Sequence, residues 1–228
     1  MVSEVTNEDN MAMMSRYPNK FFDLAIVDPP YGIDFGKFNR TNTDSTGVKV
    51  KANKYKQADW DTGIPNQEYF DELMRVSKNQ VIWGGNYFPL PPTQCFIFWY
   101  KQNPVANFSD GELAWTSFKK PALCFDYRYY GNLSGNTSAE AKHHPTQKPI
   151  ALYDFVLKKL GKPGQSILDT HLGSGSSRIA AYDLGFDFYG CELDPDYYNA
   201  QEKRFATHIA QQKLFAPQQQ ICTQTSLL

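Results

Sequence analysis

The sequence is poor in cysteine and has no Cys-x-x-Cys pair. Its 228 residues include only four cysteines, which are Cys95, Cys124, Cys191 and Cys222. Scattered single cysteines argue against a zinc site and against a disulfide framework, and they predict a reducing, cytoplasmic environment. We therefore expect a protein that uses neither a bound metal nor disulfides to hold its fold.

Long apolar runs and a strong net charge are also missing. No stretch approaches the roughly 18 apolar residues of a membrane span, so the sequence predicts no transmembrane helix. Residues 1–10 are polar and acidic without an apolar centre, which predicts no signal peptide. The 23 Lys and Arg against 24 Asp and Glu give a formal net charge of −1. This balance excludes a chain that is basic throughout, but it allows a local basic surface.

One stretch, residues 36–60, is locally basic. It holds six positive residues and only two negative ones, Asp44 and Asp59. The positive residues are Lys37, Arg40, Lys49, Lys51, Lys54 and Lys56. The stretch is rich in Asn, Thr and Ser and has no apolar period. It therefore predicts a loop that contacts nucleic-acid phosphates, with an ordinary solvated loop as the alternative.

The apolar residues 24–27 lead directly into Asp28-Pro29-Pro30-Tyr31. Prolines have no N–H to donate to a strand ladder and they hold the chain rigid, so this segment ends a buried strand. Its acid and its ring are then expected at the carboxyl end of the strand, where open α/β sheets bind ligands. Gly32, which follows at once, favours this interpretation over a plain surface turn.

A second segment, far along the chain, has the plan of a nucleoside-binding half-fold. Residues 166–169 predict a short buried strand, residues 170–177 a glycine loop, residues 178–184 a helix and residues 186–191 the next strand. The glycines allow backbone N–H groups to approach a ligand closely. In such half-folds an acid about 20 residues after the first strand contacts the ribose hydroxyls, and Glu192 follows Asp169 at close to this spacing. A plain strand–helix turn explains Gly-x-Gly alone, but Glu192 favours a bound nucleoside.

The rest of the chain alternates between strand and helix patterns. Helices are predicted over residues 11–17, 67–78, 149–160 and 195–211, and strands over residues 6–10, 80–83, 95–100, 112–115 and 122–130. This alternation predicts an α/β fold whose mostly parallel sheet is covered by helices on both faces.

A third segment, His144-Pro145-Thr146-Gln147-Lys148-Pro149, stands just before the glycine loop. In this order, the three segments resemble the permuted beta group of S-adenosylmethionine-dependent DNA amino-methyltransferases, with phage and restriction–modification adenine enzymes the most similar. Residues 81–88 and 112–115 also match, and the resemblance covers about Thr6 to Phe205. It implies a Rossmann-like methyltransferase fold with a circularly permuted motif order.

The resemblance also implies a domain plan and partners. We expect a single methyltransferase domain over residues 1–213, with a basic loop insertion at about 36–60 and a small variable region at about 126–143. Residues 214–228 are expected to form a flexible tail. The implied partner is DNA, and a homodimer is an open alternative to a monomer.

The resemblance assigns roles to individual residues. The Asp28 carboxylate and the Pro29 carbonyl would accept hydrogen bonds from the target amino group, Pro30 would stiffen the turn, and Tyr31 would stack on the base. The implied cofactor is S-adenosylmethionine. The residues implied to bind it are Asp9, Thr146, Gln147, Lys148, Asp169, His171, Gly173, Ser174, Gly175, Ser176 and Glu192.

Some positions depart from the family or have a second explanation. The family usually has Asp-Pro-Phe where this chain has Asp169-Thr170-His171, so His171 replaces an aromatic residue near the cofactor. No carboxylate or cysteine stands at a spacing that would make His171 a metal ligand. Asp9 is explained equally well as a helix N-cap. Four aromatic residues are candidates to stack on a flipped base, although core packing is the commoner role: Trp60, Tyr87, Phe88 and Trp99.

The resemblance thus implies methyl transfer to the N6 amino group of an adenine flipped out of DNA, at a specific sequence. Asp28 favours adenine, because Ser or Thr is commoner at this position in related cytosine enzymes. Methylation of cytosine N4 or of an RNA base is the nearest alternative. A nucleotide-binding Rossmann protein would leave Asp28-Pro29-Pro30-Tyr31 unexplained, and the sequence lacks a full Gly-x-Gly-x-x-Gly. An inactive DNA-binding relative is disfavoured because all the presumed catalytic residues are present.

Overall fold

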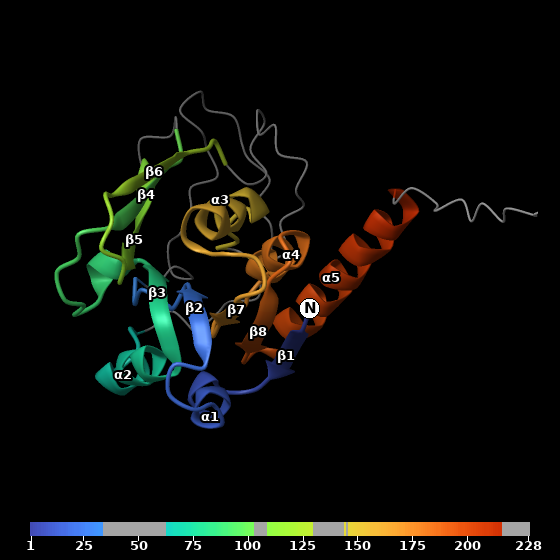
Figure 1. The fold of residues 1–228 in the computed structure, drawn as a ribbon, viewed down its shortest axis with the longest axis horizontal. Coiled ribbons are helices and arrows are strands. Elements are labelled where there is room, and N and C mark those ends of the chain that lie inside the picture. Colours follow the sequence, from blue (N-terminus) through green and yellow to red (C-terminus); the bar gives the residue numbers. More distant parts are fainter. Residues whose placement is uncertain (34–62, 103–108, 130–143, 145, 216–228) are drawn as a thin grey trace, which may run out of the picture.

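The computed structural model describes residues 1–33, 63–102, 109–129, 144 and 146–215. Most of the predicted variable region at 126–143 and the tail beyond residue 215 lie outside the described residues. The same holds for the predicted DNA contacts and one stacking candidate, which are Lys37, Arg40, Lys49, Lys51, Lys54, Lys56 and Trp60. What is described is one sheet with helices on both sides (Figure 1).

The sheet has eight strands in the order β1-β8-β7-β2-β3-β5-β4-β6. Its strands are β1 (Ser3–Asn7), β2 (Phe22–Val27), β3 (Ser77–Trp83), β4 (Phe96–Tyr100), β5 (Gly111–Thr116), β6 (Leu123–Asp126), β7 (Ser166–Asp169) and β8 (Asp187–Glu192). Neighbouring strands are parallel except where β5 pairs with β3 and β4. The prediction of a mostly parallel sheet is confirmed.

Helices cover both faces of the sheet, as predicted. They are α1 (Asn10–Ser15), α2 (Gln67–Val76), α3 (Ile150–Leu160), α4 (Ser176–Asp183) and α5 (Pro195–Phe215), with a short 3₁₀ turn η2 (Gly85–Tyr87). In Figure 1, α1 and α2 lie on one side of the sheet, and α3 and α4 lie on the other. Helix α5 packs beside α4, β8 and β1. Among the described residues, none of these helices is long and apolar enough to cross a membrane.

The second half of strand β2, residues 24–27, is apolar without interruption. Leu24 and Ile26 pack into the core beneath α3 and α4, whereas Ala25 and Val27 pack into the core beneath α1 and α2. Successive side chains of a strand point to opposite faces, and a parallel strand buried on both faces therefore needs apolar residues at every position. The central place of β2 in the sheet follows from this double burial.

Several element boundaries differ from the sequence prediction. The strand predicted over residues 6–10 lies at Ser3–Asn7, and the strand predicted over residues 122–130 is limited to Leu123–Asp126. The helix predicted to end at residue 78 ends at Val76, and β3 begins at once with Ser77. Ser77 has extended backbone angles and pairs with Phe22 of β2, while its hydroxyl donates a hydrogen bond to the Leu73 carbonyl, 2.5 Å away. Pairing with a distant strand therefore overrides the local helix pattern. Helix α5 continues to Phe215, two residues into the predicted tail.

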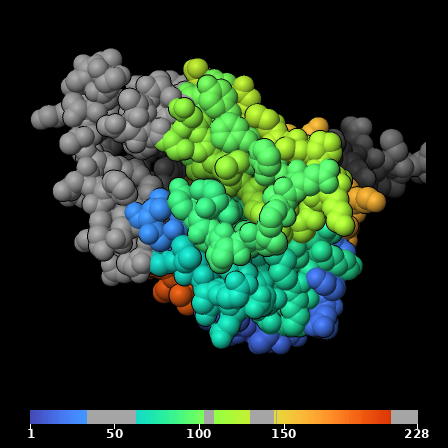
Figure 2. All heavy atoms as spheres, turned by 90° about the vertical axis from the view of Figure 1, so that its left-hand side faces the viewer, coloured from blue at the N-terminus to red at the C-terminus, as the bar shows by residue number. Residues whose placement is uncertain are grey.

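Figure 2 turns the molecule so that the β6 edge of the sheet faces the viewer. The cyan to yellow-green atoms on this face belong to the part of the chain that forms α2 and strands β3 to β6. Two alternate residues of β4, Phe96 and Tyr100, are exposed at 43% and 41% of their full accessible surface. The buried side chains of the same strand, Ile97 and Trp99, join the core beneath α3.

Candidate active site

The two segments that the sequence singled out end on neighbouring strands. Strands β2 and β7 are parallel partners, with Leu24 opposite Ile167 and Ala25 opposite Leu168. Parallel neighbours end at the same edge of a sheet, so Asp28, which follows β2, and Asp169, which ends β7, lie at one rim. Residues far apart in the sequence are thereby brought to one edge of the sheet, as predicted.

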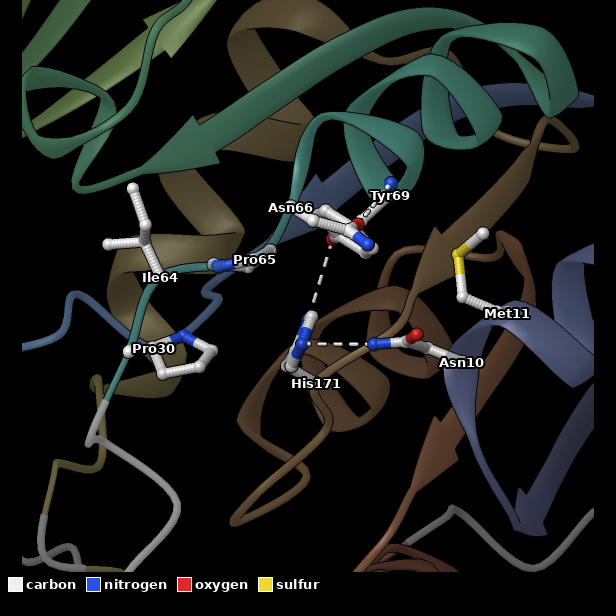
Figure 3. Close-up of a pocket in the computed structure, with 9 residues that line it drawn as sticks. Asn10, Met11, Pro30, Ile64, Pro65, Asn66, Tyr69 and His171 are labelled. Carbon is white, nitrogen blue, oxygen red and sulfur yellow. Dashed lines mark hydrogen bonds between the residues drawn. The ribbon is translucent and has the colours of Figure 1, made fainter.

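A pocket of about 250 Å³ opens at this rim. It takes residues from both segments, Pro30 from the first and His171 from the second, together with the starts of α1 and α2 (Figure 3). The other lining residues are Asn10, Met11, Gly63, Ile64, Pro65, Asn66 and Tyr69. Because its lining combines apolar and hydrogen-bonding side chains, the pocket suits a heterocyclic ligand better than it suits a purely apolar ligand.

His171 is held inside this pocket by polar neighbours. Its Nε2 lies 3.1 Å from Asn10 Nδ2, and its Nδ1 lies 3.0 Å from Thr170 Oγ1 (Figure 3 draws the first contact). Because the Asn10 amide donates, Nε2 is the acceptor and the ring proton resides on Nδ1. Burial lowers the pKa of His171 to about 4, so the ring is neutral at physiological pH.

Asp169 is buried beneath the glycine loop. Its Oδ1 accepts a hydrogen bond from the His171 backbone N–H at 3.0 Å, and its Oδ2 accepts one from Ser177 Oγ at 2.5 Å. Burial raises the pKa of Asp169 to about 7, and these two hydrogen bonds only partly oppose the shift. The carboxyl group therefore titrates near neutral pH.

The buried Asp169 is expected to make folding stability depend on pH. Its folded pKa of about 7 exceeds the ordinary value of 3.8, so its stabilising contribution is full below about pH 4 and is lost as pH rises to about 7. Between about pH 5 and pH 8, the wild type should lose about 2–3 kcal/mol more unfolding free energy than Asp169→Asn. Urea denaturation of both proteins at the two pH values measures this difference. Equal losses in the two proteins would contradict the assignment.

The glycine turn is shaped by positive backbone φ angles. Gly173 and Gly175 have φ values of 53° and 75°, a region that side chains with a Cβ rarely occupy. The Gly173 N–H donates to Glu192 Oε2 at 2.8 Å, and the Asp194 N–H donates to Glu192 Oε1 at 2.9 Å. Burial raises the pKa of Glu192. The acid predicted to meet a ribose thus lies directly against the turn predicted to carry the rest of the cofactor.

The two serines of the turn are tied to α5. Ser174 Oγ and Ser176 Oγ lie 3.1 Å apart, and both residues are buried. Arg204 Nη1 donates to the Ser174 carbonyl at 2.7 Å and to Ser176 Oγ at 3.0 Å. These contacts show a structural role for both serines, and their contact with a cofactor stays a prediction.

Asp9 caps the first helix. Its Oδ1 accepts hydrogen bonds from the Met11 and Ala12 backbone N–H groups at 2.9 and 3.1 Å. The helix-cap interpretation is therefore confirmed. A cofactor contact by Asp9 stays a prediction, although the next residue, Asn10, lines the pocket.

Asp28 and Tyr31 interact with each other at the end of β2. Tyr31 Oη donates to Asp28 Oδ1 at 2.6 Å. The Tyr31 ring stacks on the Tyr87 ring, with a centroid distance of 5.0 Å and planes 12° apart. Gly84 lies against the edge of the Tyr31 ring, where a Cβ would come within 2.2 Å of Tyr31 Cε1. The glycine therefore makes room for the ring that is expected to meet the base.

The segment that contains His144 and Lys148 contacts both the glycine turn and Asp28. His144 faces the glycine turn, because a Cβ on Gly173 would lie 3.7 Å from its ring. Thr146 Oγ1 lies 3.1 Å from His144 Nδ1, and Gln147 Nε2 donates to Tyr129 Oη at 3.4 Å. The Nζ of Lys148 lies 2.5 Å from Asp28 Oδ2, and a contact of Lys148 with the cofactor stays a prediction.

Glu112 completes this rim and was given no role by the sequence. Its Oε2 lies 3.1 Å from Lys148 Nζ, and its Oε1 pairs with Lys101. Because β5 runs against its neighbours, its first residues lie beside the last residues of β4, with Glu112 opposite Trp99. The signal available in the sequence was a lone acid at the start of an apolar strand, but its partners are distant in the chain.

The aromatic candidates for base stacking divide into two kinds. Trp99 and Phe88 are buried in the two cores, at 2% and 7% of their full accessible surface. Tyr87 is 46% exposed and stacks on Tyr31. Tyr87 is therefore the described aromatic best placed to meet a base. Within the described residues, no group of His, Cys, Asp and Glu side chains is arranged to hold a metal ion.

Comparison with known proteins agrees with this architecture. The chain matches the DNA methylase family of N6 and N4 methyltransferases over residues 90–203. It is 26% identical over 246 residues to the type II methyltransferase M.HinfI of Haemophilus influenzae, covering 89% of this chain and 68% of that protein.

Two solved structures have the same fold. The M1.HpyAVI–SAM complex gives a TM-score of 0.54 at 21% identity, covering 90% of this chain and 100% of that one. The cytosine-N4-specific PvuII DNA methyltransferase gives 0.56 at 14% identity, covering 90% and 86%. At such identities the likeness establishes the Rossmann-like methyltransferase fold and no finer property. With the family match extending over half of the chain, this protein belongs to the N6/N4 DNA methylase family.

Proposed function

We propose that this protein transfers the methyl group of S-adenosylmethionine to the N6 amino group of an adenine flipped out of DNA, at a specific sequence. The observation that carries the proposal is the shared rim of β2 and β7. It sets the Asp28 carboxylate and the pocket containing His171 at one edge of the sheet. A base inside a duplex does not reach such a rim, so the target base has to leave the stack at a cost of a few kcal/mol.

The chemistry of the amino group explains why the rim carries an acid and a rigid turn. The N6 lone pair of adenine is delocalised into the ring, which makes the nitrogen a poor nucleophile. The Asp28 carboxylate and the Pro29 carbonyl are acceptors for the two amino hydrogens. Hydrogen bonds at fixed angles draw the nitrogen toward tetrahedral geometry and direct its lone pair away from the acceptors. The methylated nitrogen is acidic and loses its proton readily, so no strong base is needed.

Tyr31 and Tyr87 supply the surface for the base. Their rings are parallel in the described structure, and Tyr87 is half exposed. Stacking of a flipped base on an aromatic side chain contributes about 1–3 kcal/mol. The base would therefore enter beside Tyr31, with its amino edge toward Asp28.

The residues at the glycine turn fit the cofactor. S-adenosylmethionine, when bound, supplies an electrophilic methyl carbon. Its nucleoside part suits the pocket of about 250 Å³ that Asn10 and His171 line, and Glu192 lies at the turn as an acceptor for ribose hydroxyls. Asp169 lies near this site and titrates near neutral pH. Once the Asp169 carboxyl group is ionised, its negative charge would favour a cationic ligand.

Cytosine N4 is the second candidate for the methylated atom. It is also an exocyclic amine on an aromatic ring, and the cytosine-N4-specific PvuII enzyme has the same fold. Asp28 at the head of the segment supports adenine, because this position in related cytosine enzymes more often carries Ser or Thr. The difference is one of substrate and not of reaction type.

The proposal is tested by identifying the labelled nucleoside. Purified protein is incubated with unmethylated DNA and tritiated S-adenosylmethionine, and the DNA is then digested to nucleosides. Label in N6-methyladenine is expected. Label in N4-methylcytosine, or label in RNA with none in DNA, would overturn the assignment.

The basic stretch, which lies outside the described residues, gives a separate prediction about DNA binding. Replacing Lys49, Lys51 and Lys54 with alanine should weaken binding and flatten its salt dependence, by roughly 0.9 in the slope for each phosphate that is no longer neutralised. The matched control replaces Lys158 and Lys159 in the last turn of α3, and Lys162 just beyond it, with alanine, which removes the same charge. Fluorescence anisotropy over a salt series measures both slopes. An unchanged slope in the first variant would show that these lysines do not contact DNA phosphates.

A further inference from the structure

A cluster of partly buried charges surrounds Asp28. Lys148 is its centre, with Nζ 2.5 Å from Asp28 Oδ2, 3.1 Å from Glu112 Oε2 and 3.1 Å from Tyr31 Oη. The Lys148 side chain is only 4% exposed. Lys101 pairs with the other oxygen of Glu112. Separate parts of the fold thus converge on one carboxylate.

The charges of this cluster balance, and the balance depends on Lys148. Two lysines face two carboxylates, and Asp28 and Glu112 both contact the same Lys148 nitrogen. Burial disfavours the ammonium, but Asp28 and Glu112 outweigh this effect and raise the pKa of Lys148. Burial would raise the pKa of Glu112, yet Lys148 and Lys101 lower it to about 2. Without Lys148, two partly buried carboxylates would face each other.

The same contacts orient the Asp28 carboxylate. Its Oδ1 accepts a hydrogen bond from the Tyr31 hydroxyl, and its Oδ2 forms an ion pair with the Lys148 ammonium. These two contacts fix the plane of the carboxylate. A carboxylate has about four lone-pair sites on two oxygens, which leaves acceptors for an amino group. The described polar contacts of Lys148 Nζ are with Asp28, Glu112 and Tyr31, and none is with the glycine turn.

From this arrangement we infer that Lys148 and Glu112 are positioning residues for methyl transfer, which keep the Asp28 carboxylate aimed at the target amino group. The inference rests on the proposed function, in which Asp28 holds that amino group. It moves Lys148 from the predicted cofactor site to the catalytic rim and gives Glu112 a role. Glu112 acts through Lys148 by holding the ammonium in place.

Other titratable groups face the cluster and must be kept constant in a test. Tyr31, Tyr69 and Tyr153 all have a pKa raised by burial and remain neutral near physiological pH. Asp169 interacts electrostatically with Asp28 and titrates near pH 7. Its contribution is common to the wild type and to every variant at positions 148 and 112, so differences between these proteins report on the cluster.

The test is the pH dependence of single-turnover methylation in four proteins, namely the wild type, Lys148→Met, Glu112→Gln and the double variant. Lys148→Met should lower the rate at neutral pH by about tenfold or more and move the acid limb of the profile to higher pH by about one unit, because a carboxylate beside a like charge binds protons more readily. Glu112→Gln should move the limb to lower pH. The double variant should bring it back toward the wild type.

Affinity for S-adenosylmethionine, measured by calorimetry, separates positioning from cofactor binding. It should stay within a few-fold of wild type in all variants, and Lys148→Arg should restore part of the lost rate. Parallel loss of affinity and rate in Lys148→Met, or acid limbs that coincide in all four proteins, would overturn the inference.

Two further measurements keep the inference testable. If Lys148→Met does not fold, the opposite shift expected of Glu112→Gln decides the matter. A ¹³C-NMR titration of the Asp28 carboxyl gives the same comparison without turnover. The nucleoside assay on the wild type is read separately, so a product other than N6-methyladenine would overturn the proposed substrate while leaving the comparison of acid limbs intact.

Discussion

Replacing Asp28 with asparagine is expected to lower the rate of methyl transfer at least about a hundredfold, the scale seen when one preorganised hydrogen-bonding group is removed from an active site. Asparagine has almost the same shape but carries no charge and presents an NH₂ group in place of one acceptor. That donor would face either the Lys148 ammonium or the Tyr31 hydroxyl, which now donates to the carboxylate. In either orientation, one of the hydrogen bonds that define the rim can no longer form.

The assay for this variant separates chemistry from binding. Single-turnover methylation gives the rate, calorimetry gives the affinity for S-adenosylmethionine, and thermal unfolding reports the fold. Affinity is expected to change by no more than a few-fold. The matched control is Asp126→Asn, the same chemical change at the exposed end of β6, which should leave the rate near wild type. Loss of rate and cofactor affinity together would mean that Asp28 serves the structure instead.

Replacing Gly84 with alanine is expected to displace the Tyr31 ring and lower the rate by roughly a hundredfold, the cost of misplacing a reactant by about 1 Å. The new methyl group would lie 2.2 Å from Tyr31 Cε1, far inside contact distance. Gly84 also has a φ of 69°, which favours glycine. Overpacking and this backbone strain should each destabilise the fold by about 1–3 kcal/mol.

The control for this variant is Gly164→Ala. Gly164 has a φ of 84°, and a Cβ there would meet no atom within 4 Å. The control therefore carries the backbone strain without the collision, and it should retain the wild-type rate at a reduced melting temperature. Comparison of the two variants isolates the effect of the ring displacement. Equal rates in both would show that the position of Tyr31 does not limit transfer.

Local chemistry explains why part of this protein was predictable from its sequence. Asp28-Pro29-Pro30-Tyr31 ends a strand wherever it stands, because proline has no N–H for the ladder. Gly173 and Gly175 mark a turn because the backbone there needs positive φ angles. The alternation of apolar runs with helix patterns then specified a mostly parallel sheet. Each of these inferences depends on residues that are near one another in the chain.

Tertiary structure decided which distant groups meet. Glu112 reaches the rim because β5 runs antiparallel between β3 and β4, and the pattern of its own residues does not state that direction. Lys148 contacts Asp28, and Ser174 is held by Arg204 of α5. Local preferences act over a few residues, whereas an ion pair between distant segments depends on strand order and on the direction of each strand. The sequence by itself therefore determined the elements and the acid that ends β2, and only the folded sheet determined what surrounds that acid.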